Sequence, residues 1–184
     1  MQTIYSVTLT PEQYVEQNYQ RKVRPPENCA NCGQANCLEA HGYYHRYVTQ
    51  SAALVLMIWV RRFLCTLCEV TVSCLPDFAQ PYRLVNTATV EAGFEGEVTR
   101  PEVQRWRSLM VAYWKRFVKH LPLLTRTVGN VFGRCPLHPS ADAFWRQMKK
   151  ACGGLATATR QLVDSFRTCL FGTYRCHQRP KVSG

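Results

Sequence analysis

Two Cys-x-x-Cys pairs are the most specific chemical motif in this sequence, because their spacing is typical of metal binding. Cys29 and Cys32 form the first pair, Cys65 and Cys68 form the second, and residues 33–64 lie between them. Each pair makes a tight turn that directs two thiolates at one ion, and two such turns complete a tetrahedron of sulfurs about 2.3 Å from zinc. The spacing therefore predicts one Zn²⁺ ion bound by all four cysteines.

A closed shell of four thiolates leaves no position open for water or substrate, so the predicted zinc is structural and not catalytic. A redox dithiol is less compatible with the pattern, because neither pair begins a helix within a βαβ unit. Disulfides or an iron centre at the same four sulfurs stay open as alternatives.

Six further cysteines keep other ligand sets open. Cys37, Cys74 and His41 lie close enough in sequence to the pairs to replace one ligand. A second, irregularly spaced set with metal-binding side chains lies near the C-terminus, namely Cys135, His138, Cys176 and His177. Buried free cysteines are common, so this set is a weaker candidate for a second metal site.

The segments around the cysteine pairs are predicted to be strands. Residues 39–50, 52–65 and 69–76 are rich in aromatic and β-branched side chains, with a turn near residues 49–51. They predict a three-stranded antiparallel sheet whose hairpin brings the two pairs together. Residues 3–9 alternate like a strand, and Thr10 with Gln13 forms a capping box for a short helix. The second strand is apolar on both faces up to Val60, so the C-terminal helices are expected to cover part of it.

From residue 84 onward the pattern becomes helical. A short helix is expected to end near Gly93 or Gly96, and a longer one follows with Thr99 as its cap. Further helices are expected over residues 141–151 and 155–171. An apolar stripe on the longer helix consists of Val103, Trp106, Met110, Tyr113 and Phe117. The fold class is therefore α+β, with a zinc ribbon in residues 1–83 and a basic helical domain in residues 84–184.

The positive charge is concentrated in the C-terminal half. The chain has a formal net charge of +11, and residues 100–184 contain 16 of its 23 basic residues but 3 of its 12 acidic residues. This asymmetry favours a polyanionic partner such as DNA, with RNA as an alternative. The cations of the longer helix that lie off its apolar stripe are Arg105, Arg107, Lys115, Arg116 and Lys119.

No membrane segment is expected. The longest apolar run covers residues 52–60, whereas a spanning helix needs about 20 residues. The first ten residues lack the pattern of a secretory signal, and ten cysteines without an export signal favour a reducing compartment. The expected location is the cytoplasm.

The region around the cysteines resembles the N-terminal zinc ribbon of many bacterial insertion-sequence transposases and of small uncharacterised bacterial relatives. The shared pattern is Cys-x-x-Cys-Gly, His-Gly-x-x-x-Arg, Arg-Arg-Phe-x-Cys-x-x-Cys, and then Leu-Pro and Pro-Tyr. It spans roughly residues 25–83 and falls on Cys29, Cys32, Gly33, His41, Gly42, Arg46, Arg61, Arg62, Phe63, Cys65, Cys68, Leu75, Pro76, Pro81 and Tyr82.

In such proteins a helix-turn-helix that ends in a motif like Val-x-Arg-Trp often follows, and here Val103, Arg105 and Trp106 match it. The resemblance implies a DNA-binding helix whose groove-facing residues are Gln104, Arg105, Arg107 and Ser108. The segment before it, residues 93–100, is longer and more acidic than the usual turn.

The sequence differs from transposases in the carboxylates that catalysis requires. A transposase of the usual type needs three separated carboxylates that hold two metal ions, but only Glu102, Asp142 and Asp164 follow residue 99. Fewer than 90 residues cannot hold the strand-rich nuclease domain. The sequence therefore predicts no enzyme.

The preferred interpretation is a non-catalytic zinc-ribbon protein that binds DNA and is related to transposase or mobile-element regulators. The alternative is a protein-interaction module of a transcription or transposition complex, which docks Tyr43, Tyr44 and Tyr47 of the hairpin on its partner. Neither a membrane nor a small-molecule substrate is expected.

Overall fold

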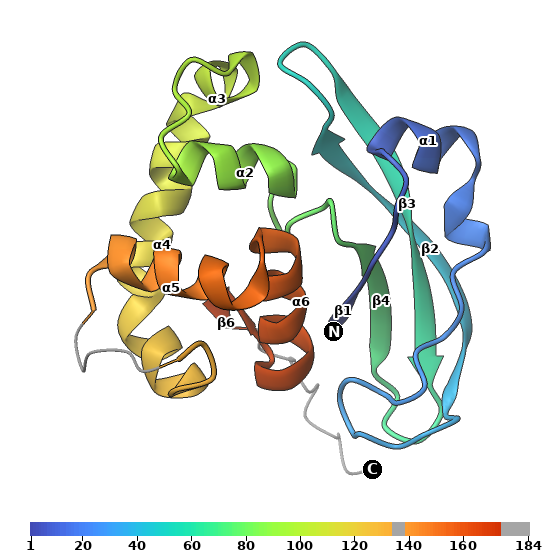
Figure 1. Cartoon of the computed structure of the whole chain (residues 1–184). Coiled ribbons are helices and arrows are strands. Elements are labelled where there is room, and N and C mark those ends of the chain that lie inside the picture. The colour runs from blue at the N-terminus through green and yellow to red at the C-terminus, as the bar shows by residue number, and fades with distance from the viewer. Residues whose placement is uncertain (134–138, 174–184) are drawn as a thin grey trace, which may run out of the picture.

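The computed structural model describes residues 1–133 and 139–173, with a four-stranded sheet on one side and most helices on the other (Figure 1). The strands are β1 (Gln2–Tyr5), β2 (Leu38–Thr49), β3 (Val55–Cys65) and β4 (Thr71–Pro76), in the order β1-β4-β3-β2. β3 is antiparallel to both of its neighbours, whereas β1 is parallel to β4. The α+β class is confirmed, but the expectation of three antiparallel strands is wrong, because β1 pairs along the free edge of β4.

The segment after β1 folds into α1 (Pro11–Glu16) and the 3₁₀ helix η1 (Tyr19–Arg21). The predicted capping box is confirmed, since the Thr10 hydroxyl accepts a hydrogen bond from the Gln13 amide and the Gln13 side chain accepts one from the Thr10 amide. Tyr14 of α1 is fully buried, and its hydroxyl donates to the carbonyl oxygen of Trp59 at 3.1 Å. This bond fixes α1 against β3.

The two faces of the β2–β3 hairpin differ in burial. Ile58 and Val60 point to the inner face and are fully buried, in a cluster with Tyr14 of α1 and Val163 near the C-terminus. Met57 and Trp59 point to the opposite face, where each is 43% exposed. The expectation that the C-terminal helices cover part of β3 is confirmed at Ile58 and Val60, which share a buried cluster with Val163 of α6 (Leu155–Phe166), whereas the opposite face of the strand is partly exposed at Met57 and Trp59.

The helical part contains α2 (Thr87–Phe94), α3 (Pro101–Arg105), α4 (Arg107–Val128), α5 (Ala141–Cys152) and α6 (Leu155–Phe166), followed by the short strands β5 (Thr168–Cys169) and β6 (Gly172–Thr173). The helix expected from residue 101 is divided at Trp106, whose φ of −102° and ψ of 18° leave the helical region. Arg100 stands at the cap position of α3 in place of Thr99, and its side chain makes no capping bond.

The core of the helical part is apolar and largely aromatic. The expected stripe is confirmed at four positions, since Val103, Met110, Tyr113 and Phe117 are buried, while Trp106 is half-buried. Around Phe94 the rings of α4, α5 and the β5–β6 turn pack at centroid distances of 4.8–6.2 Å, and they belong to Trp114, Phe117, Trp145 and Phe171. This packing holds α4 in place with its other side facing solvent.

Two buried polar residues join the sheet to the helices. Asn86 caps α2 by accepting a hydrogen bond from the Thr89 amide, and its amide side chain donates to the Thr49 carbonyl at the end of β2. Gln80 donates to the hydroxyls of Thr87 and Thr159, at 3.0 and 3.2 Å. The boundary expected near residue 83 stays a prediction, and polar contacts link the segments on its two sides.

None of the helices in the described ranges combines the length and the apolar character that crossing a membrane requires.

Candidate metal centre

Two similar turns carry the cysteine pairs at one end of the sheet. In the first turn the Gly33 amide donates to the Cys29 carbonyl at 2.8 Å, and in the second the Glu69 amide donates to the Cys65 carbonyl at 2.9 Å. The residue that closes each turn is left-handed, with φ of +75° at Gly33 and +57° at Glu69. Glycine adopts this conformation without strain. The second turn accepts a non-glycine residue at the equivalent position.

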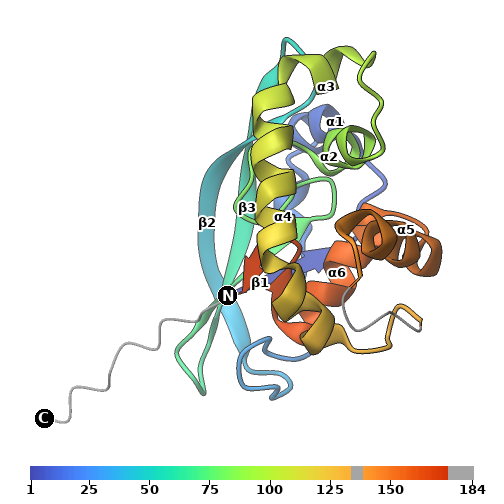
Figure 2. The same ribbon diagram turned by 90° about the vertical axis from the view of Figure 1, so that its left-hand side faces the viewer.

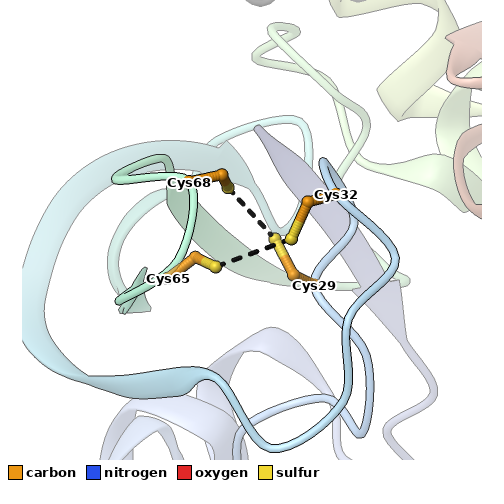
Figure 3. Close-up of side chains that lie close together, drawn as sticks. All are labelled: Cys29, Cys32, Cys65 and Cys68. Carbon is orange, nitrogen blue, oxygen red and sulfur yellow. Dashed lines mark hydrogen bonds between the residues drawn. The ribbon is translucent and has the colours of Figure 1, made fainter.

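The β2–β3 hairpin brings the two turns face to face. Cys29 Sγ lies 3.7 Å from Cys68 Sγ, Cys32 Sγ lies 3.7 Å from Cys65 Sγ, and all four sulfurs lie within 4.8 Å of one another (Figure 3). Sulfurs at the corners of a tetrahedron with metal–sulfur bonds of about 2.3 Å are about 3.8 Å apart. The prediction that these four cysteines form one cluster is confirmed, and the cluster could hold a metal ion.

The surroundings of the sulfurs shift the thiol pKa values in opposite directions. Burial raises the pKa of Cys29 to about 12. Burial also acts to raise the pKa of Cys65, but hydrogen bonds from the backbone amides of Cys68 and Leu67 outweigh it and lower this pKa to about 6. The amide donors around Cys65 stabilise its thiolate. This suits metal binding, because a metal ion binds the deprotonated form of a cysteine.

Cys37 touches the cluster without belonging to the set of four. Its Sγ lies 3.3 Å from Cys65 Sγ, and its thiol donates to the Gln34 carbonyl at 3.1 Å. The other two substitutes proposed from the sequence do not join the cluster: His41 is exposed, and Cys74 is buried on β4, where its backbone pairs with β1 and β3. The closeness of Cys37 in sequence to the first pair was the only signal for its position.

Within residues 1–133 and 139–173, no second group of three or more cysteine, histidine or acidic side chains is placed to bind a metal. The second set proposed from the sequence lies outside the described residues, because residues 134–138 and 174–184 contain Cys135, His138, Cys176 and His177.

The residues predicted to contact nucleic acid lie on α3 and α4, and all seven are exposed. Ser108, Lys115 and Lys119 follow one another at steps of seven and four residues, and Arg126 follows seven residues later, so they share one side of α4. This side lies opposite the buried stripe, and Figure 2 shows α4 running along the outside of the molecule. Arg107 and Arg116 flank the line on α4, whereas Gln104 and Arg105 belong to α3.

The ion pairs in the described part of the chain leave the cations of α4 without a carboxylate. Arg100 pairs with Glu97 and Glu102, and Lys149 pairs with Glu91 and Glu95. The helix-turn-helix itself stays a prediction, because α3 has five residues and the six-residue segment 95–100 separates it from α2.

Comparison with known proteins finds one match. A family model described as a domain of unknown function (DUF6431) matches residues 29–110, which is less than half of the chain. No curated protein and no solved structure matches. The matched region begins at Cys29 and contains all four clustered cysteines, together with Gln104, Arg105, Arg107 and Ser108, whereas Lys115, Arg116 and Lys119 lie beyond it. The cysteine cluster and the start of α4 are thus features of one family model.

Proposed function

We propose that this protein is a non-catalytic, zinc-stabilised nucleic-acid-binding protein that contacts duplex DNA through α4. The observation that carries the proposal is the charge of this helix: five arginines and lysines, no acidic residue, and a solvent-facing line of cations. A transposase-like or mobile-element regulator is the class of protein that fits this combination with a cysteine ribbon. The relation to such proteins and the cytoplasmic location are part of the proposal.

Zinc is the proposed ion because four thiolates at tetrahedral spacing form its usual structural shell. In this role the ion holds the turn before β2 against the turn after β3. It takes no part in a reaction, since four sulfurs fill its coordination positions.

DNA is the proposed partner because the exposed row of cations on α4 is long and forms no ion pair with a carboxylate in the described part of the chain. From Ser108 to Arg126 the helix extends about 27 Å, at about 1.5 Å per residue. Cations spaced over such a length contact several phosphates and release their counterions. The apolar side of α4 holds the helix on the core, so its orientation does not depend on the ligand.

The absence of catalysis is proposed from the carboxylates. Glu102 pairs with Arg100 at 3.4 Å, and Asp164 accepts a hydrogen bond from the Thr3 hydroxyl at 2.8 Å. Together with Asp142, these residues come from three different helices. In the described ranges they form no group that could hold metal ions.

A salt titration with charge variants tests the proposal. Replacing Lys115 and Lys119 with alanine is expected to weaken duplex binding and to reduce the slope of log affinity against log salt by about 2, about 1 for each lost phosphate contact. Arg146 and Lys150 are exposed cations on α5, so their double alanine variant is the matched control and is expected to leave the slope unchanged. Equal slopes in the two variants would remove α4 from the interface.

A second candidate function is protein binding through the outer face of the β2–β3 hairpin. Tyr43, Tyr47 and Trp59 are exposed there, and Met57 lies directly across from Tyr47. Tyr44 points to the opposite face and is half-buried, so it does not belong to this surface. The titration separates the two functions, because a flat salt response or no duplex binding near 100 mM salt favours the protein partner.

A further inference from the structure

A cavity of about 610 Å³ lies on the sheet, outside both the cysteine cluster and the exposed side of α4. Residues of all four strands line it, together with residues 82–84. Its volume falls in the range of about 300–1,000 Å³ that is usual for small-molecule sites. The cavity is therefore large enough for a ligand of several rings.

The polar lining of this cavity is cationic. Arg46 of β2, Arg62 of β3 and Arg83 line it, and no aspartate or glutamate does. A second cavity, of about 930 Å³ beside α5, contains Glu95 and Asp142 along with its cations. The lining of the first cavity is thus better suited to an anion than to a metal cation, whereas the second has mixed charge.

Arg46 is held in place by backbone carbonyls of the segment 80–83. Its Nη2 donates to the Gln80 carbonyl at 2.9 Å and to the Arg83 carbonyl. Arg62 lies across from Gly42 and from Ser73 in the sheet register, so the Ser73 hydroxyl lines the cavity next to it. Cations that are already positioned lose little conformational entropy when an anion binds.

Gln2 supplies a polar group that needs a ligand. This residue is 8% exposed, and its Nε2 donates to the Tyr44 hydroxyl at 3.4 Å. Its Oε1 is buried and has no hydrogen-bond partner among the described residues. A buried acceptor without a donor is costly, so a donor from a bound molecule would stabilise the protein.

The Tyr44 hydroxyl is a second polar group beside Gln2. Burial raises its pKa, although Arg46 and Arg62 both act to lower it. Tyr44 therefore stays protonated at neutral pH and can donate to an anionic oxygen.

We propose that this cavity binds a nucleotide, with its phosphate between the arginines and a base or sugar N–H or O–H donating to Gln2 Oε1. Inorganic phosphate alone does not fit as well, because it is small for this cavity and its ionised form is a poor donor to Gln2. The ring of Tyr82, which is 63% exposed, provides a face for base stacking beside the cavity, and Tyr47 lies at its edge. The nucleotide has two sources: a free mononucleotide or the phosphorylated end of a strand.

Calorimetric titration of the full-length, metal-loaded protein tests the site with 5′-AMP, adenosine and inorganic phosphate. We expect one equivalent of 5′-AMP to bind, and both adenosine and phosphate to bind at least tenfold more weakly. Arg62→Gln is expected to weaken 5′-AMP binding by about tenfold to a hundredfold, the loss typical of a charge-assisted hydrogen bond. Arg146→Gln removes a cation from the second cavity and is expected to change nothing.

Gln2→Leu is the second variant, and it is expected to weaken 5′-AMP binding about tenfold while phosphate binding is unchanged. No 5′-AMP binding at millimolar concentration, phosphate binding as tight as 5′-AMP, or equal effects of Arg62→Gln and Arg146→Gln would each overturn the site.

A 5′-phosphorylated single-stranded DNA octamer and its unphosphorylated form identify the source of the nucleotide. Tighter binding of the phosphorylated octamer than of 5′-AMP supports a strand end, and tighter binding of 5′-AMP supports a free nucleotide. The Lys115 and Lys119 double variant is expected to retain 5′-AMP binding. The proposal for this cavity and the proposal for DNA binding by α4 can therefore be refuted separately.

Discussion

The cysteine end of the sheet and the helical part are stabilised in different ways. The cluster of buried apolar side chains at the cysteine end has four members, and three of them are Cys29, Cys37 and Cys65. The cluster in the helical part has eighteen members, including Phe117, Leu124 and Met148. Apolar burial scales with area, so the helical part is expected to hold itself together, whereas the cysteine end is expected to depend on the proposed metal ion. The proposal therefore predicts a small end that needs an ion and a larger core that does not.

Metal removal should have the largest effect on this difference. A structural zinc site typically contributes about 10–16 kcal/mol, so a strong chelator is expected to unfold the cysteine end and leave the helices folded. Hydrogen exchange would show this as lost protection around residues 29–37 and 65–72 and retained protection in α4 and α6. Loss of protection throughout the chain would mean that the ion stabilises both regions equally.

Single cysteine variants sharpen the same comparison. Cys65→Ser is expected to lose the metal, because it removes one of four ligands, and zinc content measured by elemental analysis checks this. Cys74→Ser is the matched control, since Cys74 is equally buried but lies outside the cluster. Equal zinc contents in the two variants would contradict the assigned ligand set.

A core variant tests the helical part in isolation. Leu124 is fully buried in the apolar cluster, so Leu124→Ala is expected to lower the free energy of unfolding by about 2–5 kcal/mol without changing metal content. The neighbouring Leu123 is 47% exposed, and Leu123→Ala is expected to cost less than about 0.5 kcal/mol. Denaturant unfolding measures both, and a loss of zinc in Leu124→Ala would show that the two regions are not independent.

The buried hydrogen bond between Gln80, which follows the sheet, and Thr159 of α6 should have a smaller effect on stability. Gln80→Leu leaves the hydroxyl of Thr159 without its partner and is expected to cost about 1–3 kcal/mol. Adding Thr159→Val removes the unpaired hydroxyl, so the double variant is expected to be more stable than the sum of the single effects predicts. Additive effects in this double-mutant cycle, measured by thermal unfolding, would rule out this hydrogen bond.

The smallest effect concerns the carboxylate that joins α6 to β1. Burial raises the pKa of Asp164 in the folded chain, although the Thr3 hydroxyl and the Ile4 amide act to lower it. The protonated form therefore favours folding, and this contribution is lost as the pH rises from about 4 through the folded-state pKa. Asp164→Asn should flatten this loss and stabilise the chain at neutral pH by less than about 1 kcal/mol, because the site is half-buried. Parallel pH profiles of wild type and variant unfolding would contradict this.

The features predicted from the sequence are those that local spacing determines. The cysteine turns, the Thr10 capping box and the buried stripe of α4 each depend on residues a few positions apart. The long-range features could not be predicted: the parallel pairing of β1 with β4 joins Gln2 to Ser73, and Gln80 meets Thr159 across the fold. No local pattern encodes such pairs.

The same limit applies to the candidate sites. The contact of Cys37 with Cys65 and the meeting of three arginines in one cavity arise only when the sheet is assembled. The exposed cations of α4 were predictable, because they lie opposite an apolar stripe in one helix.

Elemental analysis of freshly purified, folded full-length protein tests the central claim most directly. We predict one zinc ion per chain, and replacement by cobalt(II) should give the spectrum of a tetrahedral thiolate site. Metal-free protein in which the amides of residues 29–37 and 65–72 are as well protected from exchange as those of α4 would contradict it.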